Sequence, residues 1–201
     1  MESRLYERGR EIIQNANELY IDLDVEADGI AGYGSLLSVG AVTPWGDTFY
    51  RELRPTSDTF LEGHRAFNEA HGLTRERLLI EGIEPAVAME ELAAWTERQR
   101  EAHGKRGAAV LCAYNASFDF PLIDLEMARA GIDNPFGHAG FCIKSLAQTL
   151  TENYSWKRTG KSSLPEEIIP EGDFTHHALE DAQYQQLIHF AMAGLIERRQ
   201  G

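Results

Sequence analysis

The chain has 201 residues, of which 43% are hydrophobic and 25% are charged. This length and mixture fit a single globular domain with a sizeable core, and they exclude a collagen, a coiled coil and wholesale disorder. Lysine and arginine number 19 against 32 aspartates and glutamates, so the formal net charge is −13. A protein this acidic does not bind polyanions through its overall charge, so contact with nucleic acid would need a local site or a bound cation.

Nothing in the sequence predicts a membrane-spanning segment or a signal peptide. The longest run of hydrophobic-class residues, 108–114, is far below the roughly 20 residues that a bilayer needs, and the N-terminal residues are rich in charge. Cys112 and Cys142 stand far apart in apolar surroundings, which predicts buried thiols in a reducing compartment. We therefore expect a soluble, cytoplasmic protein.

Hydrophobic periodicity predicts a polar N-terminal helical extension over residues 1–18, followed by one main domain over residues 19–201. In the first half of that domain, strands are predicted at 19–26, 35–43 and 48–53, in an antiparallel meander. The segment 60–106 has a helical pattern. Its longest helix is expected to begin at Pro85 and to carry one apolar face, formed by Met89, Leu92 and Trp95.

The second half of the domain begins with a continuous apolar run at 108–114, which predicts a fully buried strand. Helices are predicted at 117–130, 144–150 and 175–198, with a loop over 151–173. Ser117 is the expected N-cap of the first of these helices, and Gly131 is expected to end it. Together these elements predict an α/β domain with a mixed sheet.

Three acidic side chains alternate with apolar ones in the first predicted strand: Asp22, Asp24 and Glu26. Residues two apart on a strand project from one face, so the three carboxylates should line up. Such carboxylates repel one another unless a cation lies among them, and hard oxygen ligands suit Mg²⁺ or Mn²⁺. A solvated strand face would give the same pattern, so this cluster by itself leaves both interpretations open.

Two further polar clusters stand at predicted element junctions. The segment 114–119 joins the buried strand to a helix, where α/β sheets bind ligands, although Asp119 in a first helical turn also simply stabilises the helix. His176 and His177 precede Asp181 near the start of the last helix. A histidine beside a carboxylate can act as a general base near neutral pH, whereas paired histidines at a helix start can also be incidental.

In this order, the three clusters resemble the three motifs of the DEDDh 3′-to-5′ exonucleases, a family that includes ribonuclease T and the proofreading subunit of bacterial DNA polymerase. The matching segments are 24–29, 113–119 and 176–182, and 71–74 resembles the H-G-I-T segment of that family. The resemblance covers about residues 19–195. It implies a ribonuclease-H-like fold, with a five-stranded mixed sheet flanked by helices. It also implies a metal-dependent hydrolase that releases nucleoside monophosphates from 3′ ends.

Taken position by position, the resemblance implies a role for each matching residue. Two Mg²⁺ or Mn²⁺ ions would be held by four carboxylates: Asp24, Glu26, Asp119 and Asp181. His176 matches the general base, and Asp22 falls outside the pattern. The implied substrate contacts are Asn115, Phe118, His71 and Ile30. The implied partner is single-stranded nucleic acid or a 3′ overhang, either RNA or DNA, and a homodimer is a further expectation because many relatives are dimers.

Some features depart from the family pattern or extend it. Ala27 and Asp28 replace a usual pair of threonines, and Tyr114 stands where histidine is frequent, so substrate preference is open. A basic stretch with aromatic neighbours precedes the third motif and contains Tyr154, Trp156, Lys157, Arg158 and Lys161. This composition suits single-stranded nucleic acid, and it equally suits a solvated loop.

Two other classes of function compete with an active exonuclease. One is a catalytically silent exonuclease-fold module that binds a polymerase or another protein. The other is an acidic interaction domain, whose carboxylates form only a surface. Binding of Mn²⁺ separates the acidic interaction domain from the active exonuclease, because closely spaced carboxylates bind the ion and a plain acidic surface does not.

Overall fold

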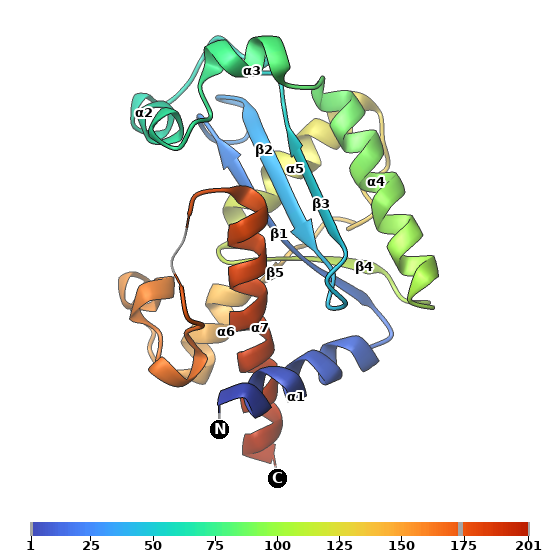
Figure 1. Cartoon of the computed structure of the whole chain (residues 1–201), viewed down its shortest axis with the longest axis vertical. Coiled ribbons are helices and arrows are strands. Elements are labelled where there is room, and N and C mark those ends of the chain that lie inside the picture. The colour runs from blue at the N-terminus through green and yellow to red at the C-terminus, as the bar shows by residue number, and fades with distance from the viewer. Residues whose placement is uncertain (1, 173–174, 201) are drawn as a thin grey trace.

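The structure is a computed structural model that describes residues 2–172 and 175–200. Its helices are α1 (Glu2–Asn15), α2 (Glu62–Ala70), α3 (Arg75–Glu81), α4 (Pro85–Ala102), α5 (Ala116–Ala130), α6 (Ile143–Leu150) and α7 (Ala178–Gln200) (Figure 1). Its strands are β1 (Leu19–Ala27), β2 (Leu36–Val42), β3 (Thr48–Glu52), β4 (Ala109–Ala113) and β5 (Phe141–Cys142). Three short 3₁₀ segments, Trp156–Thr159, Lys161–Ser163 and Glu166–Ile168, lie in the predicted 151–173 loop. Met1, Asp173, Phe174 and Gly201, which the predicted segments included, lie outside the described residues.

The five strands form one mixed sheet in the order β3-β2-β1-β4-β5. β1 pairs antiparallel with β2 and parallel with β4, so the predicted meander and the predicted mixed sheet are confirmed. The residue pattern did not predict β5, because a strand of 2 residues is too short to show a period. In this strand order β1 is the central strand, and its side chains meet other elements on both faces of the sheet.

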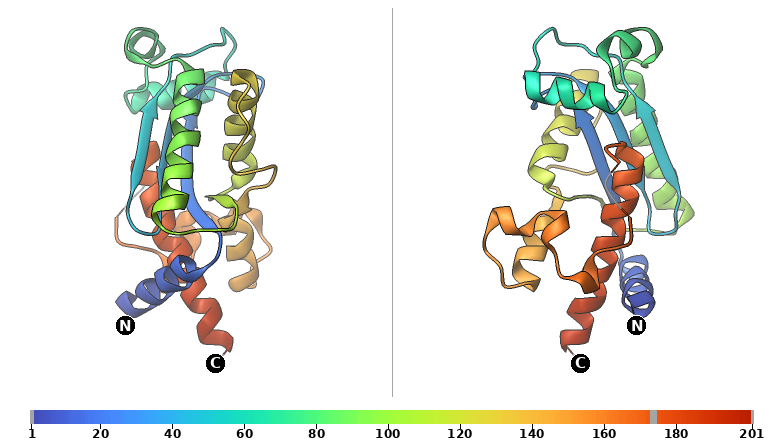
Figure 2. Two further views of the ribbon diagram at one scale, coloured as in Figure 1. Left: turned by 90° about the vertical axis from the view of Figure 1, so that its right-hand side faces the viewer. Right: turned by 60° about the vertical axis from the view of Figure 1, so that its left-hand side comes forward.

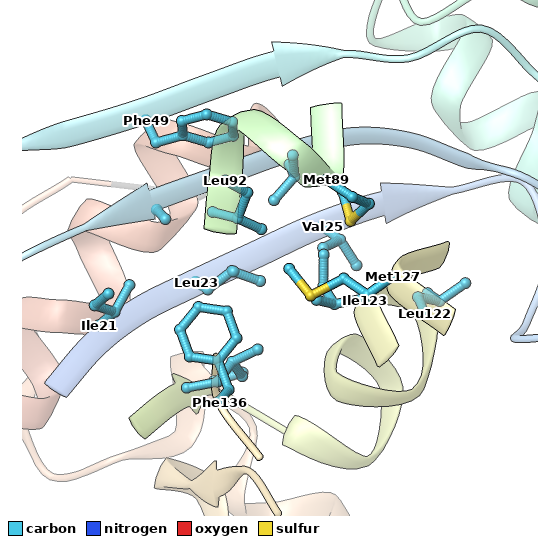
Figure 3. Close-up of a cluster of buried hydrophobic side chains, with 14 of the residues drawn as sticks. Ile21, Leu23, Val25, Phe49, Met89, Leu92, Leu122, Ile123, Met127 and Phe136 are labelled. Atoms are coloured by element: carbon cyan, nitrogen blue, oxygen red, sulfur yellow. The ribbon is translucent and has the colours of Figure 1, made fainter. Parts of the chain in front are cut away.

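The two faces of β1 have opposite character. Apolar side chains fill one face, which α4 and α5 cover, and Figure 3 shows this core around Leu23 and Val25. Every member of the predicted apolar face of α4 is buried there: Met89, Leu92 and Trp95. The acidic side chains of β1 project from the other face, where α7 lies across the sheet (Figure 2). The alternating sequence of β1 thus places a hydrophobic core behind the strand and carboxylates in front of it.

A glycine on β2 allows the start of α7 to approach the sheet closely. A Cβ added at Gly40 would overlap backbone atoms of Ala178 and Leu179. Gly40 pairs with Asp24 in the sheet register, so this contact lies directly beside the acidic face of β1.

We expect Gly40→Ala to reduce both stability and activity, because the methyl group would push the first turn of α7 away from β1. Loss of activity should be at least tenfold, since displacement of a reacting group by about 1 Å can cost as much as a hundredfold. The unfolding midpoint and the rate of nucleotide release measure the two effects. Gly63→Ala in α2, where an added Cβ meets no atom within 4 Å, is the stability control. Unchanged activity in Gly40→Ala would contradict this account.

The predicted N-terminal extension is the helix α1, and it packs against α7 (Figure 1). Two glycines allow the close approach, because a Cβ at Gly9 would overlap the carbonyl of Phe190 and a Cβ at Gly194 would overlap that of Leu5. The domain boundary at residue 18 stays a prediction.

No helix in the described part of the chain is long and apolar enough to cross a membrane. Both cysteines are free thiols. Cys112 is buried, as predicted, whereas Cys142 is only half-buried, so the prediction of two core thiols is wrong for Cys142. Cys142 lies on the short edge strand β5, which has no neighbour on its outer side within the described sheet.

Candidate active site

All four carboxylates of the predicted metal site come together in one cleft of about 390 Å³. Asp24 and Glu26 come from β1, Asp119 from α5 and Asp181 from α7. The other side chains that line the cleft include Tyr114, Asn115, Phe118, Lys161 and His176. Segments separated by more than a hundred residues thus meet at the acidic face of β1.

Asp119 reaches the cleft because α5 begins directly after β4. Asn115 makes the turn between them in the left-handed conformation, with a φ of 86°. The helix therefore starts at Ala116, and the prediction that Ser117 is its N-cap is wrong: Ser117 lies inside α5 and donates a hydrogen bond to Oδ1 of Asn115 (2.9 Å). Asp119 lies in the first turn, as predicted, and its Oδ1 accepts a 3.2 Å hydrogen bond from the Val25 amide.

The last helix begins later than predicted, at Ala178 rather than at residue 175. The cause is Asp181, whose Oδ1 accepts a 3.0 Å hydrogen bond from the Thr175 amide and turns the chain before the helix starts. His176 lies in this turn with a φ of 57°, a left-handed conformation that is uncommon outside glycine and costs backbone energy. Both histidines of the motif therefore precede the helix.

His176 lies close to two aromatic rings, one on α2 and one directly after it, and also to carboxylates of the cleft. Its ring contacts Phe67 edge-on, with the centroids 4.4 Å apart, and tilts against the ring of His71 at 4.6 Å. In addition, Glu26, His176 and Asp181 each place one possible ligand atom within 4.8 Å of those of the other two residues. Burial lowers the pKa of His176 below its usual 6.5, against the opposing effect of Asp181, so the imidazole is neutral near pH 7.

The carboxylates of the cleft raise one another's pKa. Burial is the largest cause, and together with repulsion from Asp181 it exceeds the opposing attraction of Lys161, so the pKa of Asp24 rises to about 7. The pKa of Glu26 rises to about 8, for the same reason and through repulsion from Asp24. That of Asp119 also lies well above its usual value. Full ionisation of this set therefore needs added positive charge, and hard oxygen donors of this kind fit Mg²⁺ or Mn²⁺.

Asp22 shares the face of Asp24 but lies outside the cleft. It is fully buried beneath α7, where Nδ1 of His189 lies 3.1 Å from its Oδ1. Nε2 of Gln186 lies 3.4 Å from the other oxygen. The structure therefore assigns Asp22 to a polar contact between the sheet and α7, which agrees with its place outside the motif.

A second cleft of about 360 Å³ adjoins the first and shares Glu26 and Phe118 with it. Most of its remaining wall comes from α2 and includes His64 and Phe67, which sequence reasoning missed. The sequence offered one signal for Phe67: it lies one helical turn before His71, a predicted substrate contact, in a segment with a helical pattern. Ile30 is 52% exposed and lines neither cleft, so its predicted contact with substrate stays a prediction.

Two sequence features that pointed to substrate have different surroundings from those expected. Asp28, which could have added a carboxylate near the substrate, is fully buried and pairs with Arg75. The basic stretch divides into two parts. Lys157 and Arg158 are exposed, whereas Lys161 turns inward, and its Nζ lies 4.0 Å from Oδ1 of Asp24.

The sheet order and the acidic cleft define the chain as a ribonuclease-H-like nuclease fold. The chain belongs to the family described as the 3′-5′ exoribonuclease Rv2179c-like domain, whose model matches residues 18–192. It is also 32% identical over 185 residues to the "3′-5′ DNA exonuclease Cap18" of Escherichia coli, and the match covers 90% of this chain and 95% of the relative.

Solved structures share this fold at low sequence identity. The nuclease domain of 3′hExo, described as a DEDDh family member bound to rAMP, has a TM-score of 0.64 at 12% identity, covering 91% of this chain and 92% of that one. S. pombe Pop2p in its Mg²⁺- and Mn²⁺-bound form has a TM-score of 0.63 at 13% identity. This match covers 94% of this chain and 88% of that one. Family and fold together confirm the prediction that this chain is a 3′-5′ exonuclease.

Proposed function

We propose that this exonuclease releases nucleoside monophosphates from the 3′ ends of single-stranded nucleic acid, with two divalent metal ions at its acidic cleft. The observation that carries the proposal is the meeting of four carboxylates and one neutral histidine in that cleft. The description of the family names RNA, and the name of the E. coli relative names DNA, so both are candidate substrates.

The metal ligands in this proposal are Asp24, Glu26, Asp119 and Asp181. Their raised pKa values support it, because a cation among them would relieve the repulsion that burial intensifies. These four residues would hold the ions, which when bound would supply positive charge for the phosphate and for the attacking and leaving oxygens. The bound metals named for S. pombe Pop2p agree with Mg²⁺ or Mn²⁺.

In this mechanism, His176 removes the proton from the attacking water. Its lowered pKa leaves the ring neutral near pH 7 and able to accept that proton, and Asp181 stabilises the imidazolium that results. Contacts with the rings of Phe67 and His71 help to hold the imidazole in position.

The terminal nucleotide would lie across both clefts. Phe118 lines each of them, and with Phe67 and His64 it offers rings on which a base can stack. Asn115 lines the metal cleft and can hydrogen-bond the sugar or base. We propose His71 and Ile30 as further contacts, His71 through its place beside His176.

We expect His176→Asn to lower kcat by about a hundredfold to ten-thousandfold, the usual contribution of a general base. Asparagine tolerates the left-handed backbone of this position, so the unfolding midpoint should change little. Single-turnover kinetics and thermal unfolding measure the two effects. A variant that stays fully active over a pH range of about 6 to 9 would disprove the role.

A gel assay tests the proposed function. End-labelled single-stranded RNA and DNA of one sequence are incubated with the protein and Mg²⁺ or Mn²⁺, beside Asp24→Asn and chelator controls. A ladder that shortens from the 3′ end, and that both controls abolish, is the expected result. The faster substrate identifies the nucleic acid. No cleavage of either strand by protein that binds no Mn²⁺ would overturn the assignment of the site.

A further inference from the structure

Lys161 places a positive charge inside the acidic cleft. Its side chain is 16% exposed, and its Nζ lies 4.0 Å from Oδ1 of Asp24. The ammonium is attracted by Asp24, Asp181, Asp119 and Glu26 together, which are the four proposed metal ligands. Among the described residues that line this cleft, Lys161 is the single lysine or arginine.

The fold holds this lysine in place from both sides. Thr159, two residues before it, is 1% exposed, and its carbonyl accepts a 2.7 Å hydrogen bond from the hydroxyl of Tyr114. Leu164, three residues after it, is also buried. The ammonium itself lies 5.6 Å from the centre of the Tyr114 ring. A segment anchored on the core thus directs Lys161 at the carboxylates, whereas Lys157 of the same loop is exposed.

We propose that Lys161 is a tethered counter-ion, which occupies the carboxylate cleft in the metal-free protein and competes with divalent metal for it. This inference rests on the proposed function, because it requires the carboxylates to bind metal. Nζ of Lys161 lies 4.0 Å from Oδ1 of Asp24, one of the residues that would hold the ion. The ammonium and the ion would then be close enough to repel each other strongly, so binding of metal requires Lys161 to withdraw.

The competition has a consequence for the metal-free protein. Without Lys161, four carboxylates would face one another with no cation in the cleft, and the protein would lose stability until metal arrived. With Lys161, the protein is stable without metal but binds it more weakly. The lysine therefore sets the metal concentration at which the site fills.

Titration of Mn²⁺ into nucleic-acid-free protein by calorimetry tests the proposal. Lys161→Met removes the charge and keeps a similar stem, Lys161→Arg keeps the charge, and Lys157→Met is the matched control on the exposed part of the loop. We expect Lys161→Met to bind Mn²⁺ about tenfold more tightly than wild type, from the Coulomb repulsion removed at roughly 5 Å in a water-like dielectric. The affinities of Lys161→Arg and Lys157→Met for Mn²⁺ should stay within about twofold of that of wild type. In chelator, Lys161→Met should unfold at a lower temperature than wild type.

Each other outcome decides the question. Equal or weaker Mn²⁺ binding by Lys161→Met, while wild type binds and Asp24→Asn does not, would overturn this inference and leave the metal site intact. Wild type that takes up no Mn²⁺ would overturn the site and the inference together. A Lys161→Met protein that folds only with Mn²⁺ present would support the substitution of metal for ammonium. One that fails to fold in either condition would contradict it.

Discussion

Asp24→Asn should lose at least about a thousandfold in the rate of nucleotide release, while the metal-free protein becomes more stable. The loss in rate follows from weaker metal binding, since charge stabilisation by bound metal contributes several kcal/mol to phosphoryl chemistry. The gain in stability follows because burial and repulsion from Asp181 raise the pKa of Asp24 to about 7, even against the attraction of Lys161. Unfolding by denaturant in chelator, and single-turnover cleavage with Mn²⁺, measure the two effects. A less stable Asp24→Asn protein would contradict the electrostatic account.

The pH dependence of stability gives a second readout of the same cleft. In the folded protein the pKa of Asp24 is about 7 and that of Glu26 about 8, against 3.8 and 4.5 as ordinary values. Between these limits the folded state retains protons that the unfolded state has released, so stability falls as pH rises from about 4 to about 8. The fall should be smaller in Asp24→Asn and in wild type saturated with Mn²⁺. A wild-type stability that rises across this range would contradict the assignment.

In contrast to Asp24→Asn, Asp22→Ala should lose stability and keep most of its activity. Asp22 lies two residues away on the same strand face, but it is buried against His189 and Gln186 of α7. Its removal leaves Nδ1 of the buried His189 without this partner, while Gln186 keeps its hydrogen bond to the Val42 carbonyl. The change should cost about 3 kcal/mol of stability. Activity at a temperature where the variant is folded should stay within about tenfold of wild type. Loss of Mn²⁺ binding by folded Asp22→Ala would place Asp22 in the metal site after all.

The pattern of the sequence was sufficient to predict most elements of the fold. Two-residue alternation placed Asp24 and Glu26 on one face of a strand, and the strand in the structure has that face. Gly131 ends α5 in the left-handed conformation, with a φ of 70°, as the chemistry of glycine predicts. The predicted starts of α5 and α7 were wrong, because a turn at Asn115 sets the first and a hydrogen bond to Asp181 sets the second.

The sequence by itself determined the local chemistry of this protein: which carboxylates share a strand face, which histidine accompanies them, and where apolar runs build a sheet. These properties depend on backbone period and residue type, which act between near neighbours. The tertiary structure alone decided which similar residues take different roles. Asp22 is buried against His189 while Asp24 faces the cleft, and Lys161 enters the cleft while Lys157 remains in solvent. Burial and the distance between charges fix these roles, and both depend on segments far apart in the chain.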